Sequence, residues 1–136
     1  MNVSIVSPEE EVWRGEAELV IARSPEGEFG IMRGHVPFLA ALVPGLVKVV
    51  NGSDRRAFLV TGGFLEASGP ADDYHVIVLV DDTEEVGELD AAEVKARIEE
   101  IKKRKAEEAE HGDRESAELI AQMAAAERES GHYSSR

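Results

Sequence analysis

Up to Val86, the sequence consists of short apolar runs separated by glycine and proline, and no helical pattern of ten or more residues lies between them. The runs include NVSIVS, EAELVIARS and YHVIVLVDD, and a further pair flanks the hairpin signal Asn51-Gly52-Ser53-Asp54. Parallel strands need long crossover connections, usually helices. The pattern therefore predicts an antiparallel β-sandwich or barrel. VPFLAALV, which begins at Val36, reads equally as a helical turn or a bulged strand.

The remainder of the chain has a helical pattern. Asp90 and Glu93 form a capping box, and Val94, Ile98 and Ile101 recur at helical spacing. Gly112 reads as a stop, and Asp113 reads as the cap of a second helix. We therefore expect two domains, a β-domain over 1–86 and an antiparallel two-helix hairpin over 87–136. The hairpin has a weak apolar stripe, and the sequence leaves open whether it stays docked or moves.

The charge of the chain restricts its partners. The formal net charge is -13, and residues 1–86 carry six Lys and Arg against fifteen Asp and Glu. Double-stranded nucleic acid and anionic lipid are therefore poor partners. The chain has no cysteine, its apolar runs are too short to span a bilayer, and its start does not resemble a secretory signal.

Motifs for catalysis are weak. His35, His75, His111 and His132 show no metal-ligand spacing, and no serine lies in a nucleophile elbow. The glycine pairs match neither a P-loop nor a dinucleotide fingerprint. We therefore expect no catalytic residue and no metal. His35 reads as a structural or interface residue, and an enzyme built around it is the least supported hypothesis.

The densest group of turn residues lies between Ser24 and Gly45, with glycines at 27, 30, 34 and 45 and three prolines. Glycine allows the sharp turns, and apolar residues between them offer contact area. Loops held on a rigid sandwich are common binding sites. The residues alone therefore predict an acidic adaptor domain with a helical appendage.

Several motifs resemble the epsilon-subunit family of bacterial F-type ATP synthases. They are GEFGIMRGHVPFLAALVPG from Gly27, VWRG from Val12, TGGFLEA from Thr61, and the C-terminal order LD, KRKAEE, HGD and ESAELIAQM. The resemblance spans almost the whole chain. It implies a ten-stranded β-sandwich followed by two α-helices. It also implies a non-catalytic rotor subunit that joins the gamma subunit to the c-ring, on the cytoplasmic side of the cell membrane. Proton flow would then drive ATP synthesis by the alpha and beta subunits, and the C-terminal helices would inhibit ATP hydrolysis.

The resemblance also implies contact residues. The c-ring interface falls on Glu26, Gly27, Glu28, Phe29 and Gly30, with Glu28 the principal contact. The gamma interface falls on Ile31, His35, Val36 and Phe38. The sequence does not decide which apolar members of this set face a partner and which face the core.

In the helical region, Lys102, Lys103, Arg104 and Lys105 match a basic segment that would contact the beta subunit; their spacing alone predicts a solvated face paired with nearby glutamates. Some family members bind ATP through an Asp-x-x-Arg pattern, which makes a free ATP-sensing module the alternative function. Asp90 fits that pattern, but Glu93 occupies the arginine position and Arg97 lies one turn later. We therefore expect no cofactor, with ATP at Asp90 and Arg97 as the alternative.

Overall fold

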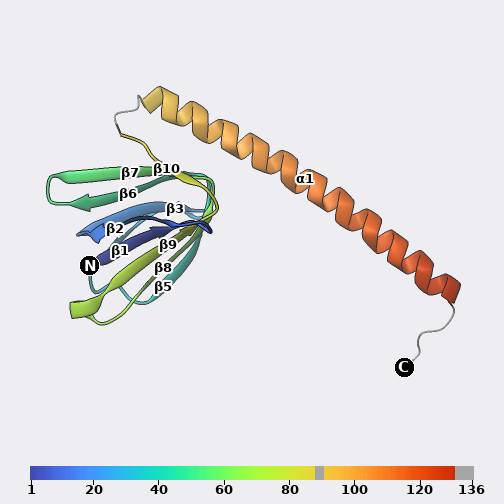
Figure 1. Ribbon diagram of the computed structural model, residues 1–136, viewed down its shortest axis with the longest axis horizontal. Coiled ribbons are helices and arrows are strands. Elements are labelled where there is room, and N and C mark those ends of the chain that lie inside the picture. The colour runs from blue at the N-terminus through green and yellow to red at the C-terminus, as the bar shows by residue number, and fades with distance from the viewer. Residues whose placement is uncertain (88–90, 131–136) are drawn as a thin grey trace. The chain divides into compact units, whose positions relative to one another are not determined.

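The computed structural model describes residues 1–87 and 91–130, and within the helix it describes the side chains of residues 91–112, 117 and 119–123. It contains ten β-strands, one 3₁₀ turn and one α-helix (Figure 1). The chain divides into two compact units, Met1–Glu99 and Glu100–Arg136.

The strands form two five-stranded sheets (Figure 1). Sheet A has the order β2 (Glu11–Glu16), β1 (Asn2–Val6), β9 (His75–Val80), β8 (Gly63–Ser68), β5 (Phe38–Leu42). Sheet B has the order β10 (Thr83–Glu85), β7 (Asp54–Val60), β6 (Gly45–Asn51), β3 (Leu19–Ser24), β4 (Gly27–Met32). The 3₁₀ turn η1 (Ala71–Asp73) connects β8 to β9. The predicted ten-stranded β-sandwich is thus confirmed.

Strand pairing is antiparallel with one exception among the described strands. β1 and β9 are parallel, with Val3 opposite Val76 and Ile5 opposite Val78. This pairing is compatible with the absence of crossover helices, because the connection between the two strands runs through most of the sandwich. The undecided run VPFLAALV forms strand β5, which pairs with β8.

The core lies between the two sheets and follows the two-residue alternation of the strands. Its largest fully buried side chains are Tyr74, Phe58, Ile5, Ile31, Leu65, Val3, Val20, Val47, Val60, Val76 and Val78. Burial of one such aliphatic or aromatic side chain contributes about 1.5–3 kcal/mol. The sandwich therefore has its own core, independent of the helix.

Trp13 of β2 covers one end of this core. Its ring lies 5.9 Å from the ring of Phe58, and the guanidinium of Arg56 lies 5.7 Å above it. A Cβ atom at Gly15 would come within 2.6 Å of the Trp13 ring. The motif VWRG therefore has a packing role, since the glycine leaves room for the tryptophan.

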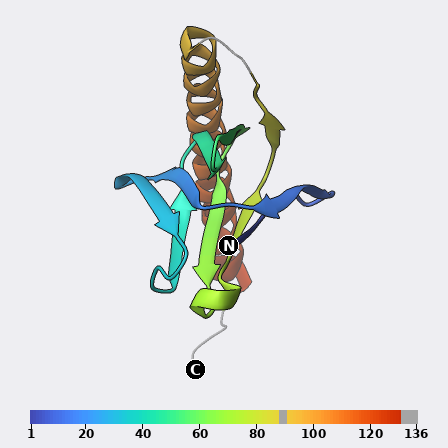
Figure 2. The ribbon, with the colours of Figure 1, turned by 90° about the vertical axis from the view of Figure 1, so that its left-hand side faces the viewer.

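The helical C-terminal region is confirmed, but it differs from the predicted hairpin. Helix α1 (Ala91–Ser130) continues through Gly112 and Asp113 without a turn, and Figures 1 and 2 show it as one unbroken coil. One glycine costs a helix only about 1 kcal/mol relative to alanine. The flanking segments are rich in Ala, Glu, Lys and Arg, which are strong helix formers, so the helix tolerates this residue.

Candidate functional site

The two edge strands β4 and β5 border an open groove, which we call the edge groove. β4 is the last strand of sheet B and β5 is the last strand of sheet A. The amide of Val43 donates to the carbonyl of Arg23 at 3.1 Å and ties the two sheets together beside it. The groove has a volume of ≈ 520 Å³ and is lined by Ser24, Pro25, Glu26, Gly27, Glu28, Phe29, Phe38, Leu39, Ala40 and Ala41.

A two-residue turn, Pro25 and Glu26, forms one wall of the edge groove. The hydroxyl of Ser24 donates to Glu26 Oε2 at 2.9 Å and accepts from the Glu26 amide at 3.2 Å. Gly27 has φ = 130°, a backbone conformation that favours glycine. The turn therefore holds the exposed carboxylate of Glu26 in place, and the carboxylate of Glu28 is exposed beside it.

Three rings gather at the other wall. The rings of Phe29 and Phe38 lie 5.1 Å apart, and the ring of His35 meets Phe38 edge-on at 5.5 Å. His35 Nδ1 lies 2.8 Å from the carbonyl oxygen of Val36. Because a carbonyl only accepts hydrogen bonds, Nδ1 is the donor in this contact. This bond fixes the orientation of the His35 ring.

The same carbonyl of Val36 accepts a second hydrogen bond, from the hydroxyl of Tyr74 at 3.3 Å. Tyr74 is 2% exposed, and its burial raises its pKa above the ordinary value for tyrosine. The hydroxyl therefore stays protonated and continues to donate at neutral pH. The loop that carries His35 and Val36 is in this way fixed to the core.

The structure brings most of the predicted contact residues together. Glu26 to Phe29 and Phe38 line the edge groove, Gly30 follows on β4, and His35 and Val36 lie on the adjoining loop. Val36 is 69% exposed. Ile31 is different, because its side chain is 1% exposed and belongs to the core. Of the alternatives that the sequence left open for Ile31, the structure shows the core.

An apolar patch on the outer face of sheet A was not predicted. Phe64 lies opposite Leu79, and Leu79 lies opposite Val6, so the three form one row across β8, β9 and β1. Leu39 and Ile77 lie in the next row on the same face, on either side of the exposed Glu66. We call these five residues the apolar strip. Leu39 is 69%, Phe64 54% and Leu79 49% exposed.

Leu39 belongs both to the apolar strip and to the lining of the edge groove. The two features are therefore continuous around the β5 edge. Exposed apolar side chains that gather on one face often mark a binding site for another protein. The sequence carried a partial signal, because Leu39 and Phe64 sit at alternate, outward positions of their strands.

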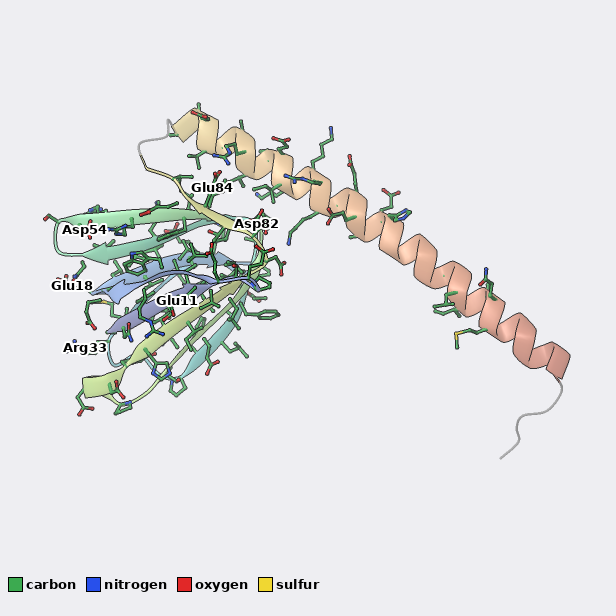
Figure 3. The ribbon with its side chains drawn as sticks, viewed as in Figure 1. Glu11, Glu18, Arg33, Asp54, Asp82 and Glu84 are labelled. Atoms are coloured by element: carbon green, nitrogen blue, oxygen red, sulfur yellow. The ribbon has the colours of Figure 1, made fainter. Side chains whose placement is uncertain are left out.

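The predicted contacts in the helical region are less well defined. Lys102, Lys103 and Arg104 are exposed, and Lys105 is half-buried. Asp90 lies outside the described residues. Arg97 forms a salt bridge with Glu84 of β10, which is labelled in Figure 3. Its guanidinium already has an anionic partner, and ATP binding at Asp90 and Arg97 stays a prediction.

Within residues 1–87 and the described side chains of α1, no three His, Asp or Glu side chains converge as a metal site. The part of α1 that the structure describes contains no stretch long and apolar enough to cross a membrane. The fold and the surface together define a β-sandwich domain whose main exposed features are an anionic groove and an adjoining apolar strip.

Residues 1–86 match the family model described as ATP synthase, Delta/Epsilon chain, beta-sandwich domain. The chain is 40% identical over 130 residues to ATP synthase epsilon chain 1 of Methylococcus capsulatus, covering 93% of this chain and 86% of the relative. It is 37% identical to the ATP synthase epsilon chain of Brevibacillus brevis, covering 76% of each. The chain therefore belongs to the ATP synthase delta/epsilon chain family, and the resemblance to the epsilon subunit is confirmed.

Two solved structures share the fold. One is described as Euglena gracilis mitochondrial ATP synthase, OSCP/F1/c-ring in rotational state 1, with a TM-score of 0.58 and 23% identity, covering 72% of this chain and 61% of that chain. The other is described as Tetrahymena thermophila mitochondrial ATP synthase, central stalk/c-ring, with a TM-score of 0.54 and 19% identity, covering 77% and 90%. At these identities they support the fold alone.

Proposed function

We propose that this chain is a non-catalytic rotor subunit of a proton-translocating ATP synthase and links the gamma subunit to the c-ring. It would act in the central stalk, on the cytoplasmic side of the cell membrane, and reach the membrane only through the complex. The family assignment supports membership in the ATP synthase. The two solved structures that share this fold, one of an F1/c-ring assembly and one of a central stalk with its c-ring, are consistent with the proposed position.

The exposed apolar strip is the observation that carries the proposal of a linking role. A connection that transmits torque must be broad, and stable interfaces bury about 800 Å² on each partner. We assign the strip and the adjoining His35, Val36 and Phe38 to the interface with gamma, because they spread over several strands and a loop rather than a single contact. Ile31 would support this surface from the core without contacting the partner.

The turn over Glu26, Gly27, Glu28, Phe29 and Gly30 is the proposed c-ring contact. Its two carboxylates are exposed, and the Ser24 hydroxyl holds Glu26 in place. A carboxylate surface favours a partner that presents cations or backbone amides. The polar loops of a c-ring would need such groups at this position for the contact to form.

Binding to gamma tests the linking role. We expect the purified chain and the gamma subunit of the same organism to form a stable one-to-one complex in sedimentation or light scattering. We expect neither the chain nor this complex to hydrolyse ATP, because the proposed role of the chain is mechanical linkage. Absence of a complex with correctly folded gamma would contradict the proposal, as would turnover by the chain alone.

We also propose that residues 87–136 form a separate regulatory region that restrains ATP hydrolysis through contact between Lys102–Lys105 and acidic residues of the beta subunit.

Removal of residues 88–136 should leave the sandwich core intact, because that core is built from residues up to Val86. ATP hydrolysis by the reconstituted synthase should then rise. A Lys102→Gln, Lys103→Gln, Arg104→Gln variant removes three positive charges and keeps the helix, so it tests whether the charge is needed for the restraint. Unchanged hydrolysis in the truncated complex would mean that the region has only a packing role.

A further inference from the structure

A second groove lies on the outer face of sheet B, and neither the family assignment nor the proposed function gives it a role. We call it the basic groove. It has a volume of ≈ 450 Å³, within the usual range for small-molecule sites. Its lining residues are Ile21, Lys48, Val50, Arg55, Arg56, Ala57, Glu85, Val86 and Gly87.

The floor of the basic groove is apolar. Ile21, Val50 and Ala57 come from three neighbouring strands and are half-buried. Val86 is 6% exposed, and its amide donates to the carbonyl of Ala57 at 2.8 Å. This bond holds the wall that follows β10 against β7. The floor therefore presents a fixed apolar surface to a flat or compact group.

Two cationic side chains, Lys48 and Arg55, lie beside this floor. Lys48 lies opposite Ala57, and Arg55 lies opposite Val50, so the two side chains are diagonal neighbours on one face. Such neighbours are about 7–8 Å apart, within reach of one ligand for long side chains. Both are exposed, and neither is paired with a carboxylate among the described residues. Four of the six basic residues in 1–86 lie on strands of sheet B: Arg23, Lys48, Arg55 and Arg56.

Arg56 compensates the one carboxylate of the groove lining. Its Nη1 donates to Glu85 Oε1 at 2.8 Å, so the one carboxylate that lines the groove is already neutralised. Arg56 lies opposite the core residue Val49, and its guanidinium lies 5.7 Å from the ring of Trp13. Its buried Nε, 3.8 Å from Asp54 Oδ2, is therefore not a contact for a ligand in the groove. Figure 3 shows Asp54 at the turn between β6 and β7. The positive charge available in the groove is that of Lys48 and Arg55.

We propose that the basic groove binds a phosphate monoester carried on a flat apolar or aromatic body. Two unpaired cations match the charge of a phosphate dianion, whereas a monocarboxylate would leave one of them uncompensated. The planar guanidinium of Arg55 suits bidentate contact with phosphate oxygens, and Lys48 adds a point charge. The body of the ligand would lie on Ile21, Val50 and Ala57. This site is separate from the edge groove and from the apolar strip.

Titration of the full chain with phenyl phosphate, followed by NMR of the backbone amides, tests the site. We expect saturable shifts at residues of the basic groove. A Lys48→Gln, Arg55→Gln variant should bind at least about tenfold more weakly, because each charge-assisted hydrogen bond to phosphate is strong. Both side chains are exposed, and thermal unfolding of the variant should match that of the unmodified chain. Arg14→Gln, which replaces an exposed arginine of sheet A, is the matched control and should leave binding unchanged.

Three further probes separate the parts of the proposal. Inorganic phosphate tests the charge alone, phenol tests the apolar body alone, and benzoate tests a monoanion on the same body. We expect each to bind more weakly than phenyl phosphate. Equal binding of benzoate would overturn the assignment to phosphate, and equal binding of inorganic phosphate would overturn the role of the floor. Shifts that persist in the Lys48→Gln, Arg55→Gln variant, or that appear elsewhere, would overturn the site itself.

Discussion

Replacement of Gly63 by alanine should strongly destabilise the protein. Gly63 begins β8 and lies between Leu42 of β5 and Val80 of β9, so it sits inside sheet A. Its φ is +140°, which disfavours residues that carry a Cβ. An added Cβ would lie 1.9 Å from the carbonyl oxygen of Leu79, and a backbone atom of a central strand cannot move aside cheaply. We expect the free energy of unfolding to fall by roughly 3 kcal/mol or more, the sum of backbone strain and a lost strand contact.

Urea unfolding of Gly63→Ala measures this loss, and Gly52→Ala is the matched control. Gly52 also has a positive φ, +65°, but nothing lies within 4 Å of its added Cβ. Gly52→Ala should therefore cost only about 1–2 kcal/mol, the price of the left-handed conformation. Equal midpoints for the two variants would show that the approach of Leu79 does not constrain Gly63.

Local sequence patterns were sufficient to predict the sandwich and its β6–β7 hairpin. The Asn51–Asp54 signal forms the β6–β7 hairpin, with Asn51 opposite Asp54. The pairing of strands far apart in the chain could not be predicted from the sequence, because nothing in NVSIVS or YHVIVLVDD indicates that β1 and β9 are parallel neighbours. The continuity of α1 through Gly112 was also missed. A glycine that reads as a stop has only a small helix penalty, and its strong helix-forming neighbours outweigh it.

The candidate site was also predictable only in part, because only some of its features depend on local sequence. The glycine and proline turns located the Glu26–Gly30 segment, since turn chemistry is local. The edge groove could not be predicted, because Phe29 and Phe38 meet across the edges of two different sheets. The apolar strip was hidden because HVIVLV is almost wholly apolar, and such a run does not tell which of its residues face outward. Only the register of β9 assigns Val78 to the core and Leu79 to the surface.

Placing charge on the apolar strip should abolish binding to the gamma subunit without unfolding the chain. Leu39 and Phe64 are each more than half exposed, so a Leu39→Glu, Phe64→Glu variant should change the free energy of unfolding by no more than about 1 kcal/mol. In a gamma complex both carboxylates would become buried without partners, and a central apolar contact is typically worth about 2–4 kcal/mol. We expect the dissociation constant to rise at least about 100-fold, since each 1.4 kcal/mol is a factor of ten. Met32→Glu is the matched control, because Met32 is 61% exposed on the outer face of sheet B. Isothermal titration calorimetry with purified gamma would decide the point: undiminished affinity in the double variant would remove the apolar strip from the interface, and a loss confined to Met32→Glu would move the interface to sheet B.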